Sequence, residues 1–390
     1  MNFERTPEQN AIVEAVSQLC SDFGPDYWAE LDREHRFPEA FHQAMAGAGW
    51  LGIAMPERFG GAGLGITEAA LIMQTVSASG AGFSGASAIH MNVFGLNPVV
   101  VFGTEAQQAA ALPPLIDGRE KACFAVTEPD AGLDTTRLKT QAVRTADGSA
   151  YRVDGRKIWI STAQVATRML LLARTTPLDA VARPTQGLSL FYTALDRDRI
   201  EVREIEKMGR KAVDSNMLFI DNLRVSRDDL IGNEGDGFRY LLHGLNPERI
   251  LIAAEAIGLG QAALRRATQY ACERVVFGRP IGQNQSIQHP LAQAWMQLEA
   301  AWLMVMKAAT RYDAGQSCGA EANAAKYLGA EAAFQACQTA IATHGGMGYA
   351  KEYHVERYLR ECMIPRLAPV SPQLILCYIA EKVLGLPKSY

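Results

Sequence analysis

A change of pattern in the middle of the chain most constrains its fold. Between about Lys121 and Ile231 the sequence holds short runs of β-branched, aromatic and aliphatic residues with turn residues between them, a pattern that predicts strands. Before and after this block, apolar residues recur at helical spacing. Because the helical and strand patterns are segregated along the chain, the sequence predicts an α+β architecture. The predicted strands are Cys123–Val126, Gln141–Val143, Tyr151–Ile160, Met169–Ala173, Leu188–Thr193 and Met217–Val225.

The strand-rich block predicts a small β-barrel or sandwich, because its strands are short and regularly interrupted by turns. Within it, Asp154-Gly155 is the dipeptide that favours a tight hairpin. We therefore expect the chain to reverse direction at these two residues.

The helical blocks on either side differ in length. Near the N-terminus, Thr6, Pro7 and Gln9 fit a capping box that begins a helix, and further helical patterns cover Ala40–Ala48, Thr67–Ser79 and Thr104–Leu112. After Gly235 the patterns are long, with short connections, which is typical of an antiparallel four-helix bundle. They cover Ile250–Val275, Gln288–Ala314 and Ala320–His344. The predicted domains are an N-terminal helical domain (1–120), a β domain (121–232) and a four-helix-bundle domain (233–390).

The composition argues against several classes of function. A net charge of −4 on 390 residues gives no basic field for nucleic acid or an anionic membrane. The N-terminus MNFERTPEQN lacks the features of a signal peptide, and we expect no apolar stretch long enough to cross a bilayer. Seven cysteines without CxxC spacing favour reduced thiols and a cytoplasmic location. The seven histidines show no HxxxH or HExxH motif, so we expect no metal site.

Eight motifs, in order along the chain, resemble those of the acyl-CoA dehydrogenases, from roughly Leu19 to Leu386. They are PERFGGAGLG, CFAVTEPDAGLD, DGRKIWIS, KMGRKAVDSNMLFIDNLRV, GNEGDGF, ERVVFGRPI, HGGMGY and EYHVERYLRE. The resemblance implies the three-domain fold of that family and FAD as cofactor. It also implies a reaction in which a base removes the α-proton of an acyl-CoA thioester while the β-hydride passes to flavin N5.

The resemblance also implies which residues hold FAD. One strand would contact the flavin ring through Phe124, Val126 and Thr127, and another through Trp159 and Ser161. A flavin needs a flat apolar or aromatic wall and hydrogen-bond donors near its nitrogens, which these residues can supply. The adenosine and pyrophosphate would be held from a neighbouring subunit, so a homo-oligomer, a dimer or tetramer, is implied. The further residues implied in FAD binding are Arg274, Phe277, Gln285, Gly345, Gly346, Ser371 and Gln373.

The catalytic base is not in its usual place for such a protein. Most members carry a glutamate late in the chain, and Pro369 stands at that position. A minority, including isovaleryl- and long-chain-type enzymes, carry it in a segment like LDLER, which matches Leu245–Arg249. The resemblance thus assigns the base to Glu248 and substrate contacts to Asn246 and Arg249. The alternative is an ordinary helix start, with Asn246 as N-cap and Glu248 favoured by the helix dipole.

The function expected from these residues is that of an acyl-CoA dehydrogenase of fatty acid metabolism. It would make a trans-2-enoyl-CoA and pass electrons to an electron-transferring flavoprotein. Two alternatives stay open: a related flavin oxidase or monooxygenase that uses O2, and a non-catalytic flavin- or acyl-CoA-binding homologue. Leu133 stands where the family usually has Ser, which affects the expected contacts to the substrate arm.

Overall fold

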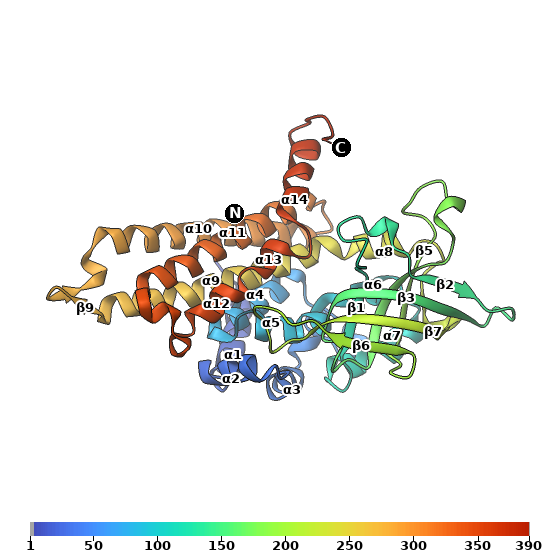
Figure 1. The fold of residues 1–390 in the computed structure, drawn as a ribbon, viewed down its shortest axis with the longest axis horizontal. Coiled ribbons are helices and arrows are strands. Elements are labelled where there is room, and N and C mark those ends of the chain that lie inside the picture. The colour runs from blue at the N-terminus through green and yellow to red at the C-terminus, as the bar shows by residue number, and fades with distance from the viewer. Residues whose placement is uncertain (1–3, 390) are drawn as a thin grey trace.

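The computed structural model describes residues 4–389 and shows a helical body with a β part at one end (Figure 1). N-terminal helices lie along one side of the long C-terminal helices, and the sheet lies beyond them at the right of the view. This arrangement confirms the predicted α+β class, with helices at both ends of the sequence and strands between them.

The N-terminal part consists of short helices that pack on the C-terminal helices. Helix α1 begins with the predicted capping box, in which the Gln9 amide nitrogen donates to Thr6 Oγ1 at 3.2 Å and the Thr6 amide nitrogen donates to Gln9 Oε1 at 3.1 Å. Helix α4 packs on α9 and α10 through buried apolar residues. The helices are α1 (Pro7–Ser21), α2 (Pro25–Glu34), α3 (Glu39–Gly47), α4 (Ile66–Val76), α5 (Gly82–His90), α6 (Asn97–Phe102) and α7 (Glu105–Ile116).

The middle part is one eight-stranded sheet. Seven strands follow the order β6-β7-β3-β2-β4-β5-β8, and β1 pairs with β4. The β1–β4 pair is parallel whereas most neighbours are antiparallel, so the sheet is mixed. The strands are β1 (Ala122–Ala125), β2 (Gln141–Arg144), β3 (Ala150–Ser161), β4 (Arg168–Arg174), β5 (Leu188–Ala194), β6 (Ile200–Glu204), β7 (Ser215–Ser226) and β8 (Leu230–Ile231).

The predicted hairpin at Asp154-Gly155 is wrong. Strand β3 runs straight through both residues, with only a register shift against β7 between Val153 and Gly155. The chain reverses at Gly148, whose φ of 69° suits a turn between β2 and β3. Gly155 is needed for close packing instead, because a Cβ there would lie 2.3 Å from Thr140 Oγ1.

The C-terminal part is built on three long helices, α9 (Leu245–Glu273), α10 (Gln285–Asp313) and α11 (Gly319–His344), which pack on one another. A two-stranded hairpin, β9 (Val275–Val276) and β10 (Arg279–Pro280), forms the tip between α9 and α10, at the left of Figure 1. The shorter helices are α8 (Gly237–His243), α12 (Val355–Glu361), α13 (Ile364–Leu367) and α14 (Pro372–Tyr378).

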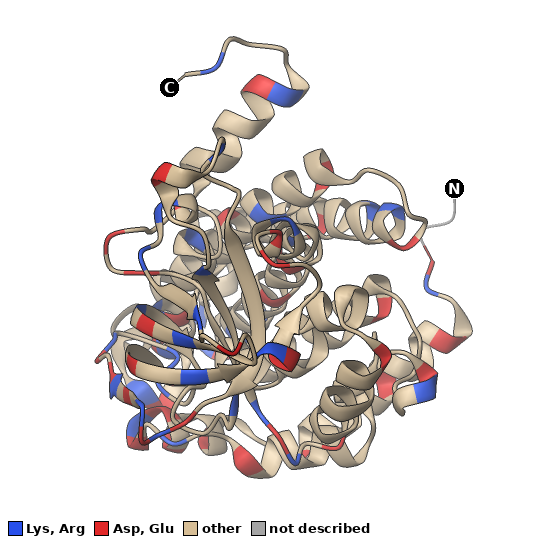
Figure 2. Cartoon of the chain, turned by 90° about the vertical axis from the view of Figure 1, so that its right-hand side faces the viewer, with Lys and Arg blue, Asp and Glu red and all other residues tan. Residues whose placement is uncertain are grey.

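One apolar helical stretch requires a correction. We expected none long enough to cross a bilayer, yet Ile66–Phe102 passes by length and composition. Its most apolar window is 67% buried inside the protein, where α4 and α5 pack against α9. The stretch therefore contributes to the protein core. Figure 2 shows basic residues (blue) and acidic residues (red) interspersed along the helices and strands.

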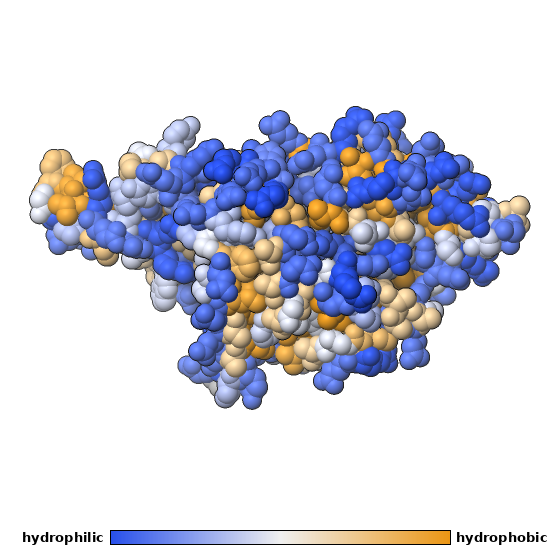
Figure 3. All heavy atoms as spheres, turned by 90° about the horizontal axis from the view of Figure 1, so that it is seen from below, coloured by the Kyte–Doolittle hydropathy of each residue, from blue (hydrophilic) through white to orange (hydrophobic). Residues whose placement is uncertain are grey.

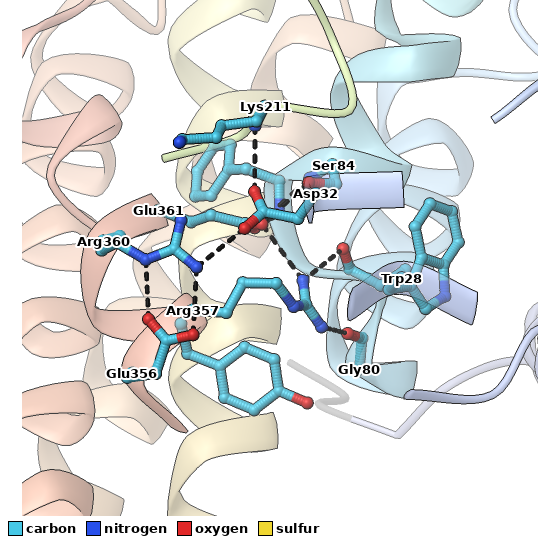
Figure 4. A network of polar contacts seen from close by, with 12 residues as sticks. Trp28, Asp32, Gly80, Ser84, Lys211, Glu356, Arg357, Arg360 and Glu361 are labelled. Carbon is cyan, nitrogen blue, oxygen red and sulfur yellow. Dashed lines mark hydrogen bonds and ion pairs between the residues drawn. The ribbon is translucent and has the colours of Figure 1, made fainter. Parts of the chain in front are cut away.

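A buried polar network attaches α5 to α12 (Figure 4). The Glu361 carboxylate accepts hydrogen bonds from the amide nitrogens of Phe83 (2.7 Å) and Ser84 (3.3 Å) and from Ser84 Oγ (2.8 Å). Arg357 pairs with the same carboxylate at 3.1 Å and donates to the Gly80 carbonyl at 2.6 Å. Because Glu361 satisfies free N–H groups at the start of α5, it fixes the position of that helix.

Candidate active site

The ends of β1 and β3 lie side by side, as the sequence motifs predicted. The Ile158 amide nitrogen donates to the Thr127 carbonyl at 2.9 Å, so the residues that follow β1 lie next to Trp159. Val126 is buried and Phe124 and Thr127 are half-buried. The structure thus brings together Phe124, Val126, Thr127 and Trp159.

A buried ion pair that sequence reasoning missed fastens this arrangement. Lys157 is fully buried, and its Nζ donates to Glu128 Oε1 at 2.9 Å and to the carbonyls of Val126 (3.0 Å) and Leu172 (2.7 Å). Burial lowers the pKa of Lys157 to about 8, although Glu128 acts in the opposite direction. The ammonium group therefore ties three segments of the sheet together. The segment DGRKIWIS gives no sign of this burial in the sequence, because lysine is almost never fully buried.

Trp159 stands out from this framework. Between Lys157 and Ile160 the register of β3 shifts against β7, and Trp159 adopts a left-handed backbone with φ of 62°. Its side chain is 57% exposed, which is unusual for a tryptophan within a strand. A bulge that turns one aromatic residue outward re-aims its side chain for contact with another molecule.

Ser161, at the end of β3, is oriented by a half-buried arginine. Arg210 Nη2 donates to Ser161 Oγ at 2.9 Å and to Ser215 Oγ at 2.9 Å, and Nη1 donates to Ser87 Oγ at 3.3 Å. Because the Ser161 oxygen accepts from Arg210, its own O–H is free to donate elsewhere. Arg210 was not among the predicted site residues.

Glu248 lies in the first turn of α9 and points into the protein. Its Oε2 lies 2.7 Å from Nε2 of His90, and its side chain is 26% exposed. The helix begins at Leu245 after Gly244, so Asn246 does not cap it as the alternative interpretation required. Asn246 Oδ1 instead accepts from Arg249 Nη1 at 3.1 Å. The two residues predicted to contact substrate are thus held together.

His90 lies between two carboxylates. Its Nδ1 lies 2.6 Å from Oε1 of Glu255, which is fully buried on the same helix as Glu248. Burial lowers the pKa of His90, but the two carboxylates outweigh burial and hold that pKa well above its usual value. Burial raises the pKa of Glu255. Sequence reasoning missed both residues, although a lone charged residue in the apolar run AAEAIG was a signal for Glu255.

Three family models together match most of the chain. They describe the N-terminal, middle and C-terminal domains of acyl-CoA dehydrogenases and match residues 6–119, 123–223 and 235–369. The chain belongs to the acyl-CoA dehydrogenase family. Members of this family are FAD-dependent oxidoreductases.

Individual relatives agree with this assignment. Acyl-CoA dehydrogenase fadE12 of Mycobacterium bovis is 36% identical over 100% of this chain and 99% of its own length. The solved structure of glutaryl-coenzyme A dehydrogenase with glutaryl-CoA has a TM-score of 0.94 at 30% identity, covering 100% of this chain and 98% of that one. The prolyl acyl carrier protein oxidase AnaB has a TM-score of 0.91 at 28% identity, covering 98% and 100%.

The residues at β1 and β3 fit the flavin of an acyl-CoA dehydrogenase. The outward Trp159 offers the flat aromatic wall, and Ser161 offers a free hydroxyl donor beside the half-buried Arg210 cation. Such donors and charges are what stabilise a reduced flavin. Among residues 4–389, no group of three or more His, Cys, Asp or Glu could hold a metal ion.

Five other residues predicted to bind FAD lie at the opposite end of α9 from Glu248. Arg274 follows α9 and Phe277 is fully exposed in the β9–β10 hairpin with φ of 52°. Twenty-six residues of helix separate Glu248 from Arg274, which is about 40 Å. Gly345 and Gly346 follow the end of α11, where His344 stacks on Tyr270 at 4.4 Å, so they lie at the same end as Arg274. Gln285 begins α10 and is exposed there.

The two remaining predicted FAD contacts lie at the start of α14. Ser371 caps this helix, because its Oγ accepts from the Leu374 amide nitrogen at 3.3 Å. Gln373 is exposed. Ser371 therefore has a structural role in this chain, and the exposed Gln373 side chain is available to a ligand.

Proposed function

We propose that the protein dehydrogenates an acyl-CoA thioester between Cα and Cβ, with Glu248 as the base. The observation that supports this role is the direction of the Glu248 side chain, which faces His90 inside the protein and keeps partial access to solvent. A carboxylate on a solvated helix start would have no such partner. Pro369, at the usual position of the family's base, cannot accept a proton.

In this proposal each of the site residues has a separate role. One Glu248 oxygen is held by His90, and the other accepts the α-proton of the thioester. Bound FAD supplies a hydride acceptor at N5. Trp159 and the backbone around Thr127 orient the ring, and Ser161 donates a hydrogen bond to it. Asn246 and Arg249 contact the substrate from the first turn of α9.

We propose a homo-oligomer, and a tetramer as its form, because the FAD residues lie at two ends of one chain. The hairpin that carries Phe277 exposes apolar side chains at the tip of the molecule, the left end in Figure 3. Arg274, Phe277, Gln285, Gly345 and Gly346 would hold the FAD of a neighbouring subunit. Arginine suits a diphosphate because its fork binds two oxygens at once.

The electron acceptor we propose is an electron-transferring flavoprotein, and the location we propose is the cytoplasm, in fatty acid metabolism. A second candidate is an oxidase that passes electrons to O2. The similarity to the prolyl acyl carrier protein oxidase favours testing it. A base at Glu248 fits both candidates, because an oxidase that takes electrons from a thioester must also remove the α-proton. The two candidates differ in the acceptor that reoxidises the flavin.

The test is to mix the purified holo-protein anaerobically with a panel of acyl-CoAs and to record flavin absorbance. The panel should include short, medium and branched acyl groups. Bleaching by a thioester that persists until an electron-transferring flavoprotein is added supports the proposal. Bleaching followed by rapid reoxidation in air identifies the oxidase. An unchanged spectrum with every thioester contradicts both and leaves a non-catalytic homologue.

A further inference from the structure

We propose that His90 is a positioning residue for the base: held by Glu255, it donates from Nε2 to Glu248 and fixes that carboxylate for proton abstraction. This inference rests on the proposed function of Glu248. It adds a linear Glu248–His90–Glu255 arrangement that the sequence motifs did not contain.

The geometry leaves both ring nitrogens of His90 facing carboxylate oxygens, at 2.7 Å for Glu248 and 2.6 Å for Glu255. An ionised carboxylate only accepts hydrogen bonds, so two ionised partners require a ring that donates from both nitrogens. Such charge-assisted hydrogen bonds are short and directional. His90 is buried, so water does not compete for either nitrogen.

The elements around His90 hold it rigidly. It is the last residue of α5, whose first turn is fixed by Glu361 from α12. Both carboxylates come from α9, two turns apart at Glu248 and Glu255, so the imidazole ring bridges two turns of one helix. A base whose position is set by a buried helix and a buried side chain cannot swing away when substrate arrives.

The charges near this group come from several elements. Arg210, between β6 and β7, faces Glu255 and Glu361. On α12, Arg357 and Glu361 pair with each other. On α3, His42 bonds to Asn92 at 3.4 Å and not to His90. The two carboxylates on α9 are thus the charges that act directly on the ring.

The arrangement makes a kinetic prediction that a purely structural role does not. His90→Gln keeps a side-chain donor for Glu248, whereas His90→Leu removes the donor and keeps an apolar side chain. We expect the anaerobic bleaching rate at saturating thioester to fall about tenfold or more in His90→Leu, because Glu248 loses its fixed position, and to recover largely in His90→Gln. The thioester concentration that gives half of the maximal rate should change little in either variant.

The matched control is His42→Leu, which removes another buried histidine that does not contact Glu248. Its bleaching rate at saturating thioester should stay close to the wild-type rate. Thermal melting and the flavin spectrum of the variants check the fold. A wild-type rate in His90→Leu, or equal losses of rate in His90→Leu and His90→Gln, would overturn the positioning role.

A second measurement is independent of the reaction. We would record ¹⁵N NMR spectra of ¹⁵N-histidine-labelled holo-protein at pH 8 and assign the His90 signals by their loss in His90→Gln. Both ring nitrogens should be protonated, and in Glu255→Gln the ring should become neutral. A neutral His90 in the wild type refutes the pairing. A doubly protonated ring in a protein that no thioester bleaches refutes the proposed function, and any catalytic role for His90 with it.

Discussion

Replacement of Glu361 by Gln tests the buried network that positions α5. Both Glu361 oxygens accept: Oε2 from the amide nitrogens of Phe83 and Ser84, and Oε1 from Ser84 Oγ and Arg357. A glutamine amide would turn an NH2 group toward some of these donors and leave Arg357, which is 2% exposed, without a counter-charge. Breaking a buried ion pair in this way costs about 3–5 kcal/mol of the free energy of unfolding.

The assay is urea unfolding followed by tryptophan fluorescence, since Trp28 packs against α5 at Gly85 and reports on this region. The matched control is Glu201→Gln, which removes the same charge from an exposed pair with Arg203 at 2.7 Å. Exposed pairs contribute about 0–1 kcal/mol. If Glu361→Gln lowers the free energy of unfolding no more than Glu201→Gln does, the network does not hold α5 as argued.

Three further predictions concern the sheet and the flavin wall. Between pH 8 and 10.5 the folded protein has lost the Lys157 proton, whereas the unfolded chain still holds it. The free energy of unfolding should therefore rise with pH over this range, by up to about 3 kcal/mol relative to Lys157→Met. Parallel curves of unfolding free energy against pH for the two proteins would contradict this. Trp159→Ala should leave the melting temperature nearly unchanged, because the residue is 57% exposed. It should weaken FAD binding by about 1 kcal/mol or more in a flavin fluorescence titration. An unchanged FAD affinity would show that Trp159 does not contact the flavin. Gly155→Ala should destabilise the protein by about 1–3 kcal/mol in thermal unfolding, because its Cβ would overlap Thr140; a neutral effect would show that β2 and β3 can separate there.

Local sequence signals predicted most of the architecture. The Thr6–Gln9 capping box and the long helices after Gly235 depend on residues close in sequence, and both were recognised. The hairpin prediction failed because Asp-Gly favours a tight turn locally, whereas contacts distant in the sequence decide the conformation of Asp154 and Gly155. Gly155 packs against Thr140, the residue before β2, and the Asp154 carboxylate accepts from the Asn222 amide nitrogen at 2.7 Å. Only the tertiary structure shows those partners.

Partners distant in the sequence also complete the candidate site. Motif order predicts site roles for Glu248, Trp159 and Ser161, because each lies in a recognisable segment. His90 and Arg210 come from a helix and a loop far away in the sequence, and they meet the site only after packing. A histidine in an apolar helix has many possible partners, so its contact with Glu248 could not be read from spacing.

The most direct test of the account is the anaerobic flavin bleaching rate of Glu248→Gln with the thioester that best reduces the wild type. The account predicts a variant that keeps FAD and its melting temperature but reacts about 10²–10⁴-fold or more slowly, because the α-proton has no acceptor. Glu201→Gln, far from the site on an exposed strand, should react at the wild-type rate. A Glu248→Gln protein that bleaches at a rate close to the wild type would show that another group takes the proton.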